Sequence, residues 1–226
     1  YESADALIAV SPELKDVIKK RFNKDALYIP NIVDTDLFKW IPSQKHTDDP
    51  TFKFISIGGL IYRKRMDLII EAFAKAFGKN KDVTLTIFGE GPERPNLENL
   101  IRKYQLNDRV ELMGLQSRKT LAEYLKTSDC FVLPSQAETF GVVYIEALAS
   151  GVPVIATKCG GPEGFVNDKN GLMIPVDDID ALTDAMTYMY HNTGRYNKES
   201  ISKETRDMFS PETIADKLTD IYKNLI

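Results

Sequence analysis

The positions of apolar residues along the chain predict strands and helices in regular alternation. Helices are expected where apolar residues recur at intervals of three and four, near residues 65–77, 93–104, 117–127, 141–150 and 178–190. Short apolar runs between them predict strands near residues 52–57, 83–88, 109–113, 130–133, 152–156 and 171–174. This alternation indicates an α/β fold with a Rossmann-like, doubly wound parallel sheet.

The residues before this regular region form a smaller unit. An apolar run at residues 6–10 predicts a strand, and the cap Ser11 with Pro12 predicts a helix that ends near Phe22. The polar residues 42–50 are typical of a linker, which separates residues 1–41 from a domain at 51–195. Residues 196–226 are expected to form the closing helices.

Composition and charge narrow the class of protein. The 226 residues are 43% hydrophobic and 27% charged, as in an ordinary globular domain. The net charge of -4 gives no general attraction to nucleic acid, so no nucleic-acid partner is expected. Cys130 and Cys159 belong to no metal-type cluster, and we interpret them as buried free thiols. With no long apolar run and no secretion signal, we expect a cytoplasmic protein.

Two short motifs have ordinary explanations. Gly89 and Gly91 match the first two glycines of a dinucleotide fingerprint, but Arg94 replaces the third, which argues against a nicotinamide or flavin site. Small residues in this turn would still let a ligand approach the backbone closely. The Asp-x-Asp pairs at 34–36 and 178–180 are interpreted as turn and helix-start residues, because no third oxygen ligand or histidine is near. No metal site is predicted.

The most informative segment covers residues 134–157. Its apolar spacing predicts a helix that begins between Glu138 and Glu146. The free amides and positive dipole at such a helix start attract a phosphate, so a diphosphate could bind there without a metal. Glu138 could accept hydrogen bonds from sugar hydroxyls and Glu146 from ribose hydroxyls. The alternative is that both are ordinary exposed glutamates, and these residues alone do not decide between the two interpretations.

A longer series of residues resembles the group 1 glycosyltransferases, a large family of retaining enzymes with two Rossmann-like domains (the GT-B fold). Their signature is a pair of glutamates eight positions apart, followed by a segment of glycine, proline and apolar residues. The residues of this chain that match the signature are Glu138, Phe140, Gly141, Glu146, Ala149, Gly151, Pro153, Val154, Ile155 and Ala156. Supporting matches along the chain are Ser11, Pro12, Ile29, Pro30, Asn31, Val33, Asp34, Phe38, Gly58, Leu60, Lys64, Gly89, Gly91, Pro92, Val110, Gly114, Gly160 and Gly161.

The resemblance implies one half of a GT-B fold. The chain would be the donor-binding C-terminal domain, preceded by the last strand and helix of an N-terminal acceptor domain, toward which the closing helices pack back. The whole enzyme would transfer a hexose-type sugar from a nucleoside diphosphate sugar to a glycan or lipid-linked acceptor, with retention of configuration, as in polysaccharide and cell-wall biosynthesis.

The same resemblance implies that the enzyme requires neither a metal nor a cofactor. It also allows the whole enzyme to associate peripherally with a membrane when the acceptor is lipid-linked. These 226 residues alone are expected to bind the donor without transferring it. Two alternatives stay open on this fold, a sugar-nucleotide 2-epimerase-like enzyme and a non-catalytic nucleotide-sugar binder.

Residue roles follow from the resemblance. Lys64 would neutralise the diphosphate and, with Glu138, form the catalytic pair; Glu146 would bind ribose. The backbone of residues 140–142 would hold the sugar and phosphate, and that of 113–114 would frame the base. The complete donor-binding set is Gly58, Gly59, Arg63, Lys64, Gly89, Gly91, Met113, Gly114, Glu138, Phe140, Gly141, Val142 and Glu146.

One departure from the family pattern concerns charge. The family often has an arginine on the diphosphate where this chain has Gly59, so one cation is absent. Arg63 and Arg65 are the candidates to replace it, and Arg65 itself stands where a glycine commonly follows the lysine.

Overall fold

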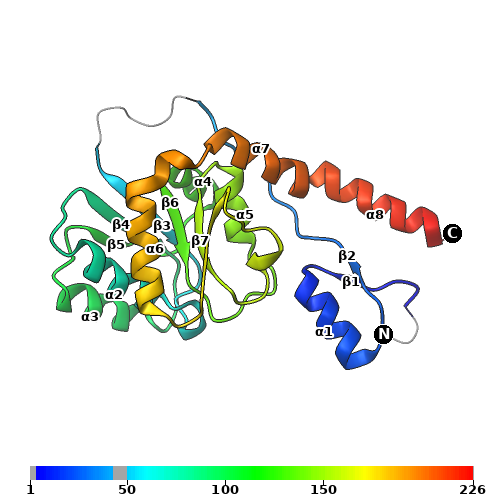
Figure 1. Cartoon of the computed structure of the whole chain (residues 1–226), viewed down its shortest axis with the longest axis horizontal. Coiled ribbons are helices and arrows are strands. Elements are labelled where there is room, and N and C mark those ends of the chain that lie inside the picture. Colours follow the sequence, from blue (N-terminus) through cyan, green and yellow to red (C-terminus); the bar gives the residue numbers. More distant parts are fainter. Residues whose placement is uncertain (1–3, 43–49, 226) are drawn as a thin grey trace.

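The computed structural model describes residues 4–42 and 50–225, which form a small N-terminal unit beside a larger α/β domain (Figure 1). The small unit contains β1 (Ile8–Ala9), α1 (Pro12–Phe22) and β2 (Leu27–Tyr28), and its two strands are parallel. The side chain of Ser11 accepts a hydrogen bond from the amide of Leu14, and Pro12 opens the helix. The predicted helix start is therefore confirmed.

The larger domain is built on six parallel strands in the order β5-β4-β3-β6-β7-β8. The chain enters at the centre of the sheet, winds to one edge, returns and winds to the other, which is the doubly wound order. The predicted fold class is confirmed, and each strand lies within two residues of its predicted range. The strands are β3 (Phe52–Ile57), β4 (Val83–Phe88), β5 (Val110–Leu112), β6 (Cys130–Leu133), β7 (Val154–Thr157) and β8 (Gly171–Ile174).

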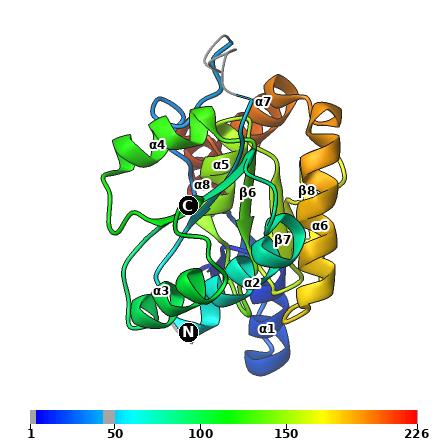
Figure 2. The same cartoon turned by 90° about the vertical axis from the view of Figure 1, so that its left-hand side faces the viewer.

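Helices cover both faces of this sheet (Figures 1 and 2). One face carries α2 (Met66–Phe77), α3 (Arg94–Lys103) and α6 (Ile179–Asn192), and the other carries α4 (Arg118–Thr127), α5 (Val142–Ala149) and α7 (Lys198–Phe209). Short 3-10 helices occupy Tyr62–Lys64, Pro162–Gly164 and Thr193–Arg195. A sheet covered on both faces needs apolar side chains on both, which explains why every residue of β6 and β7 is buried.

The core extends beyond the strands and helices. Val33 and Phe38, which follow β2, are fully buried in it, and the amide of Val33 donates to the carbonyl of Phe209 at 2.9 Å. Cys130 is buried, as expected, but Cys159 is only half-buried, so that part of the cysteine prediction is wrong. The predicted linker falls mainly on residues 43–49, which lie outside the described residues.

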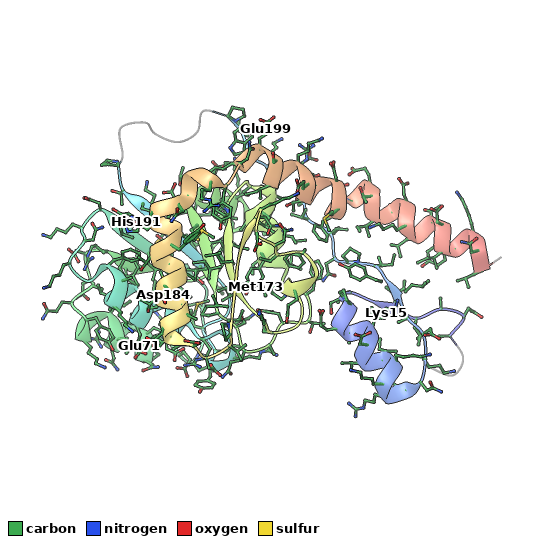
Figure 3. All side chains as sticks on the ribbon, viewed as in Figure 1. Lys15, Glu71, Met173, Asp184, His191 and Glu199 are labelled. Carbon is green, nitrogen blue, oxygen red and sulfur yellow. The ribbon has the colours of Figure 1, made fainter. Side chains whose placement is uncertain are left out.

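The chain closes with α7 and α8 (Pro211–Leu225). Helix α7 packs against the core through Ile201 and Phe209, whereas α8 buries only Ile214. Figure 3 shows side chains crowded between the sheet and its helices but standing clear along most of α8. This helix extends toward the end of the molecule where β1 and β2 lie (Figure 1). Among the described residues, no helix is both long and apolar enough to cross a membrane.

Candidate functional site

A cavity of about 460 Å³ lies at the carboxyl ends of the central strands, beside the small N-terminal unit. Parallel sheets bind ligands at this edge, and the volume is in the range of ligand sites. Val10 and Asn31, which the sequence did not single out as site residues, contribute from the N-terminal unit. The other lining residues are Arg63, Lys64, Ala137, Glu138, Thr139, Phe140, Gly141, Val142 and Val143.

An ion pair lies in this cavity. Lys64 ends the 3-10 helix after β3, and its Nζ lies 2.5 Å from Oε1 of Glu138, in the loop after β6. The hydroxyl of Ser135 donates to the same oxygen at 2.8 Å. The two loops are also joined through their backbones, because the amide of Gln136 donates to the carbonyl of Arg63. The structure therefore brings the predicted pair together, although 74 residues separate the two side chains.

The backbone of Glu138 is held from its other side by the loop after β7. Its amide donates to the carbonyl of Cys159, and its carbonyl accepts from the amide of Gly161. A Cβ at Gly161 would lie 2.4 Å from the carbonyl oxygen of Phe140, so only glycine allows this approach. The position of Glu138 is consequently set by three loops and not by its own loop alone.

Helix α5 points its N-terminus at the same cavity. It begins at Val142, between the two glutamates as predicted, and Gly141 precedes it with φ 91° and no side-chain cap. A Cβ at Gly141 would lie 2.6 Å from the ring of Tyr144. Within the described parts of the chain, the amides of Val142 and Val143 have no hydrogen-bond acceptor. These two donors and the helix dipole offer a place for an anion.

Glu146 lies one turn into α5 and is only 2% exposed, so it is not an ordinary surface glutamate. Its Oε1 lies 2.8 Å from Nη2 of Arg118 but accepts no well-aligned hydrogen bond. Burial raises the pKa of Glu146, and the Arg118 guanidinium opposes that rise. A buried carboxylate with an incompletely satisfied oxygen is suited to accept from a hydroxyl group.

Arg118, the partner of Glu146, was not predicted from the sequence. It opens α4, and its guanidinium lies over the ring of Phe38, with 5.0 Å between Cζ and the ring centroid. A signal was present, because a basic residue in the first turn of a helix opposes the helix dipole and usually has another reason to be there. Here that reason is Glu146.

The predicted glycines of the neighbouring loops serve close packing. A Cβ at Gly89 would lie 1.9 Å from the carbonyl oxygen of Gly58, and one at Gly91 would lie 2.3 Å from that of Leu60. The amide of Gly89 donates to the carbonyl of Gly114, which has φ 68°. These glycines hold the loops after β3, β4 and β5 together, with the half-buried Met113 directly before the last of them, but none of these predicted residues lines the cavity.

The two Asp-x-Asp pairs have structural roles, as predicted. Asp34 accepts hydrogen bonds from the amides of Asp36 and Leu37 in a turn. Asp178 caps α6 by accepting from the amide of Ala181.

A larger cavity, of about 580 Å³, lies on the side of the sheet where the strands begin. Its lining includes Asp168 and Lys169 before β8 and Arg195 and Tyr196 after α6. These residues lie toward the amino end of β8, where doubly wound sheets do not place their ligands. We therefore place the functional site in the smaller cavity at Lys64 and Glu138.

The chain is also similar in sequence to known proteins. The chain is 30% identical over 201 residues to the gpi3 subunit of phosphatidylinositol N-acetylglucosaminyltransferase from Schizosaccharomyces pombe, covering 87% of this chain and 43% of that protein. It is 28% identical over 241 residues to N-acetyl-alpha-D-glucosaminyl L-malate synthase from Bacillus anthracis, covering 100% of this chain and 61% of that protein. The chain thus spans less than two thirds of either relative.

A solved structure shares the fold over nearly the whole chain. Sucrose-phosphate synthase from Thermosynechococcus elongatus superposes with a TM-score of 0.86 at 27% identity, covering 99% of this chain and 59% of that one. The family description "Glycosyl transferases group 1" matches residues 39–208. The α/β domain is accordingly one half of a GT-B fold, and the chain belongs to the group 1 glycosyltransferases.

Proposed function

We propose that this chain is the donor-binding part of an enzyme that transfers a hexose-type sugar from a nucleoside diphosphate sugar to a glycan or lipid-linked acceptor, with retention of configuration. The observation that carries the proposal is the Lys64–Glu138 pair at the uncapped start of α5, one turn from the buried Glu146. A cation, a carboxylate and an anion-binding helix start meet there, and the second carboxylate, Glu146, lies one turn further along the helix. These are the groups that a diphosphate and two sugar rings require.

The diphosphate would lie between Lys64 and the free amides at residues 142 and 143. Lys64 would meet one phosphate as a point charge, and the amides would donate to the other. Because these protein groups supply positive charge, the proposal includes no metal ion and no cofactor. Donor binding in the presence of EDTA should accordingly equal that in its absence.

The two carboxylates would bind the sugars on either side of the diphosphate. Glu138 faces the cavity and would accept from hydroxyls of the transferred sugar, while Glu146 would accept from the ribose. The loop at residues 113–114, which packs against Gly89, would frame the base. In this arrangement the transferred sugar would lie closer to the N-terminal unit than the ribose and the base.

The bond to be broken joins the anomeric carbon to the leaving phosphate oxygen. Lys64 and the helix start would stabilise the charge that develops on the leaving nucleoside diphosphate. Glu138 is engaged by Lys64 and Ser135, and Glu146 by Arg118, so neither is assigned as a nucleophile. The acceptor hydroxyl would attack from the face that the diphosphate leaves and pass its proton to the leaving oxygen, which retains the configuration.

Calorimetric titration with UDP-, GDP- and ADP-sugars tests the site. Two relatives carry N-acetylglucosaminyl in their names, so UDP-N-acetylglucosamine is the first donor to try. Lys64→Ala and Glu146→Ala should each weaken binding of the preferred donor by about 10- to 100-fold, because each removes a charge-assisted contact.

Two matched controls lie away from the cavity. Lys75→Ala and Glu123→Ala remove exposed charges whose partners are Asp180 and Lys126, and they should leave donor affinity unchanged. Unchanged affinity in both site variants would refute the site assignment. Donor turnover to an epimer without an acceptor, or no turnover by the whole protein, would refute the transferase assignment while leaving donor binding intact.

A further inference from the structure

The loop that leads from β3 into α2 carries three consecutive cations, Arg63, Lys64 and Arg65. Lys64 is matched by Glu138. A nucleoside diphosphate sugar carries negative charge on each phosphate, and the start of α5 contributes only about half a positive charge. A second cation is therefore needed at the cavity, and the two arginines differ in whether they can provide it.

Arg65 is already neutralised. Its Nε and Nη2 donate to the carboxylate of Asp67 at 3.0 to 3.3 Å, and its Nη1 pairs with Asp177. Its side chain is 12% exposed and lies over the ring of Tyr62. Arg65 thus joins the start of α2 to the loop after β8. It is absent from the lining of the cavity, so it is a structural residue.

Arg63 has the opposite environment. It lines the cavity next to Lys64, it is exposed, and it forms no ion pair with any described residue. Its carbonyl accepts from the amide of Gln136, which holds this part of the backbone against the loop of Glu138. An unpaired guanidinium on a long side chain, anchored at the mouth of a cavity, can reach an anion inside it without losing another partner.

We propose that Arg63 is the second diphosphate ligand of this chain and supplies the guanidinium that is absent at Gly59. The proposal rests on the proposed function and specifies its phosphate contacts. A planar guanidinium can donate two parallel hydrogen bonds to phosphate oxygens, whereas Lys64 acts as a point charge. Arg63 and Lys64 together would compensate both phosphates while Glu138 stays available to the sugar.

A second substitution, at Gly59, can restore the guanidinium that is lost when Arg63 is replaced. It is exposed and lies outside the positive-φ glycines, and an added Cβ would meet only the carbonyl oxygen of Glu90, at 3.9 Å. A side chain is therefore tolerated at this position. Gly59→Arg places a guanidinium on the same loop, where it can take over the contact that Arg63 makes.

The test compares the affinities of UDP, GDP and ADP with those of the corresponding monophosphates, so that the contribution of the outer phosphate is isolated. For the nucleotide that wild type prefers, Arg63→Gln should weaken diphosphate binding by about 10- to 100-fold and monophosphate binding by less than about threefold. In Arg63→Gln/Gly59→Arg, the preference for the diphosphate should recover by about tenfold or more.

Two control variants separate this contact from other effects. Arg65→Gln should lower the melting temperature but keep the diphosphate preference, and Arg102→Gln, on an exposed part of α3, should change neither. An undiminished preference in Arg63→Gln, or its loss in a folded Arg65→Gln, would overturn the proposal. A wild-type protein that binds none of the three diphosphates would instead refute the proposed function, and this inference with it.

Discussion

Glu146 is a carboxylate at 2% exposure, and the groups that face it set its protonation. Burial raises its pKa above the ordinary 4.5, Asp34 in the segment after β2 raises it further, and Arg118 at the start of α4 lowers it. Hydroxyl donors of a ribose bind the ionised form better, because only that form offers all its lone pairs. Donor affinity should therefore fall as the pH falls through the raised pKa of Glu146.

Arg118→Gln removes the one group that opposes this rise. The pKa of Glu146 then rises further, so the fall in donor affinity on acidification should begin closer to neutral pH. Arg118→Lys keeps the charge, so its donor affinity should fall over nearly the same pH range as in wild type. The measurement is donor affinity by calorimetry between about pH 4.5 and pH 8. Coincident profiles for wild type and Arg118→Gln would contradict the effect of Arg118 on the protonation of Glu146.

The contacts that the sequence could not predict are those set by tertiary packing. The roles of Lys64, Glu138 and Glu146 came from the family resemblance, and the structure brings the first two into contact. The pair formed by Arg118 and Glu146 depends on how the start of α4 lies relative to α5, and no local pattern encodes that. Arg63 and Arg65 are equally basic in the sequence, and only the partners of Arg65 separate their roles.

At the scale of elements, strands buried on both faces were the easiest to predict. The structure has β3 at Phe52–Ile57 and β6 at Cys130–Leu133, as the apolar runs indicated, because polar residues or turn signals bound each run. The apolar pattern did not reveal that Val33 and Phe38 pack into the core. The hydrogen bond from Val33 to Phe209 at the end of α7 joins distant parts of the chain, so the local sequence around Val33 does not predict it.

The loops after β3 and β4 depend on a glycine at their contact. Gly89 has φ 140°, and a Cβ there would lie 1.9 Å from the carbonyl oxygen of Gly58. Gly89→Ala should lower the free energy of unfolding by about 2–4 kcal/mol, because backbone strain and a steric clash add. Gly194→Ala is the matched control, since no atom lies within 4 Å of its added Cβ, and it should change stability by less than about 0.5 kcal/mol. Urea denaturation measures both, and equal costs would refute the packing role.

At the scale of the whole molecule, binding and transfer can be separated. The groups proposed to bind the donor lie in loops after the strands of the sheet and at the start of α5, all within the described residues. The chain spans 43% of the gpi3 relative and 61% of the malate synthase relative. Recognition of an acceptor is accordingly proposed for the whole protein, in which the small N-terminal unit at the mouth of the cavity would connect donor to acceptor.

These 226 residues should therefore bind the donor with an affinity within about tenfold of that of the whole protein, because the same contacts to the diphosphate and ribose are present. They should release no nucleoside diphosphate beyond the rate of spontaneous hydrolysis, since no acceptor hydroxyl is held against the anomeric carbon. The measurement is nucleoside diphosphate release with and without membranes that carry lipid-linked sugars, using both proteins. Acceptor-dependent release by the 226 residues alone would show that the acceptor also binds to this half, and the assignment of transfer to the whole protein would then be wrong.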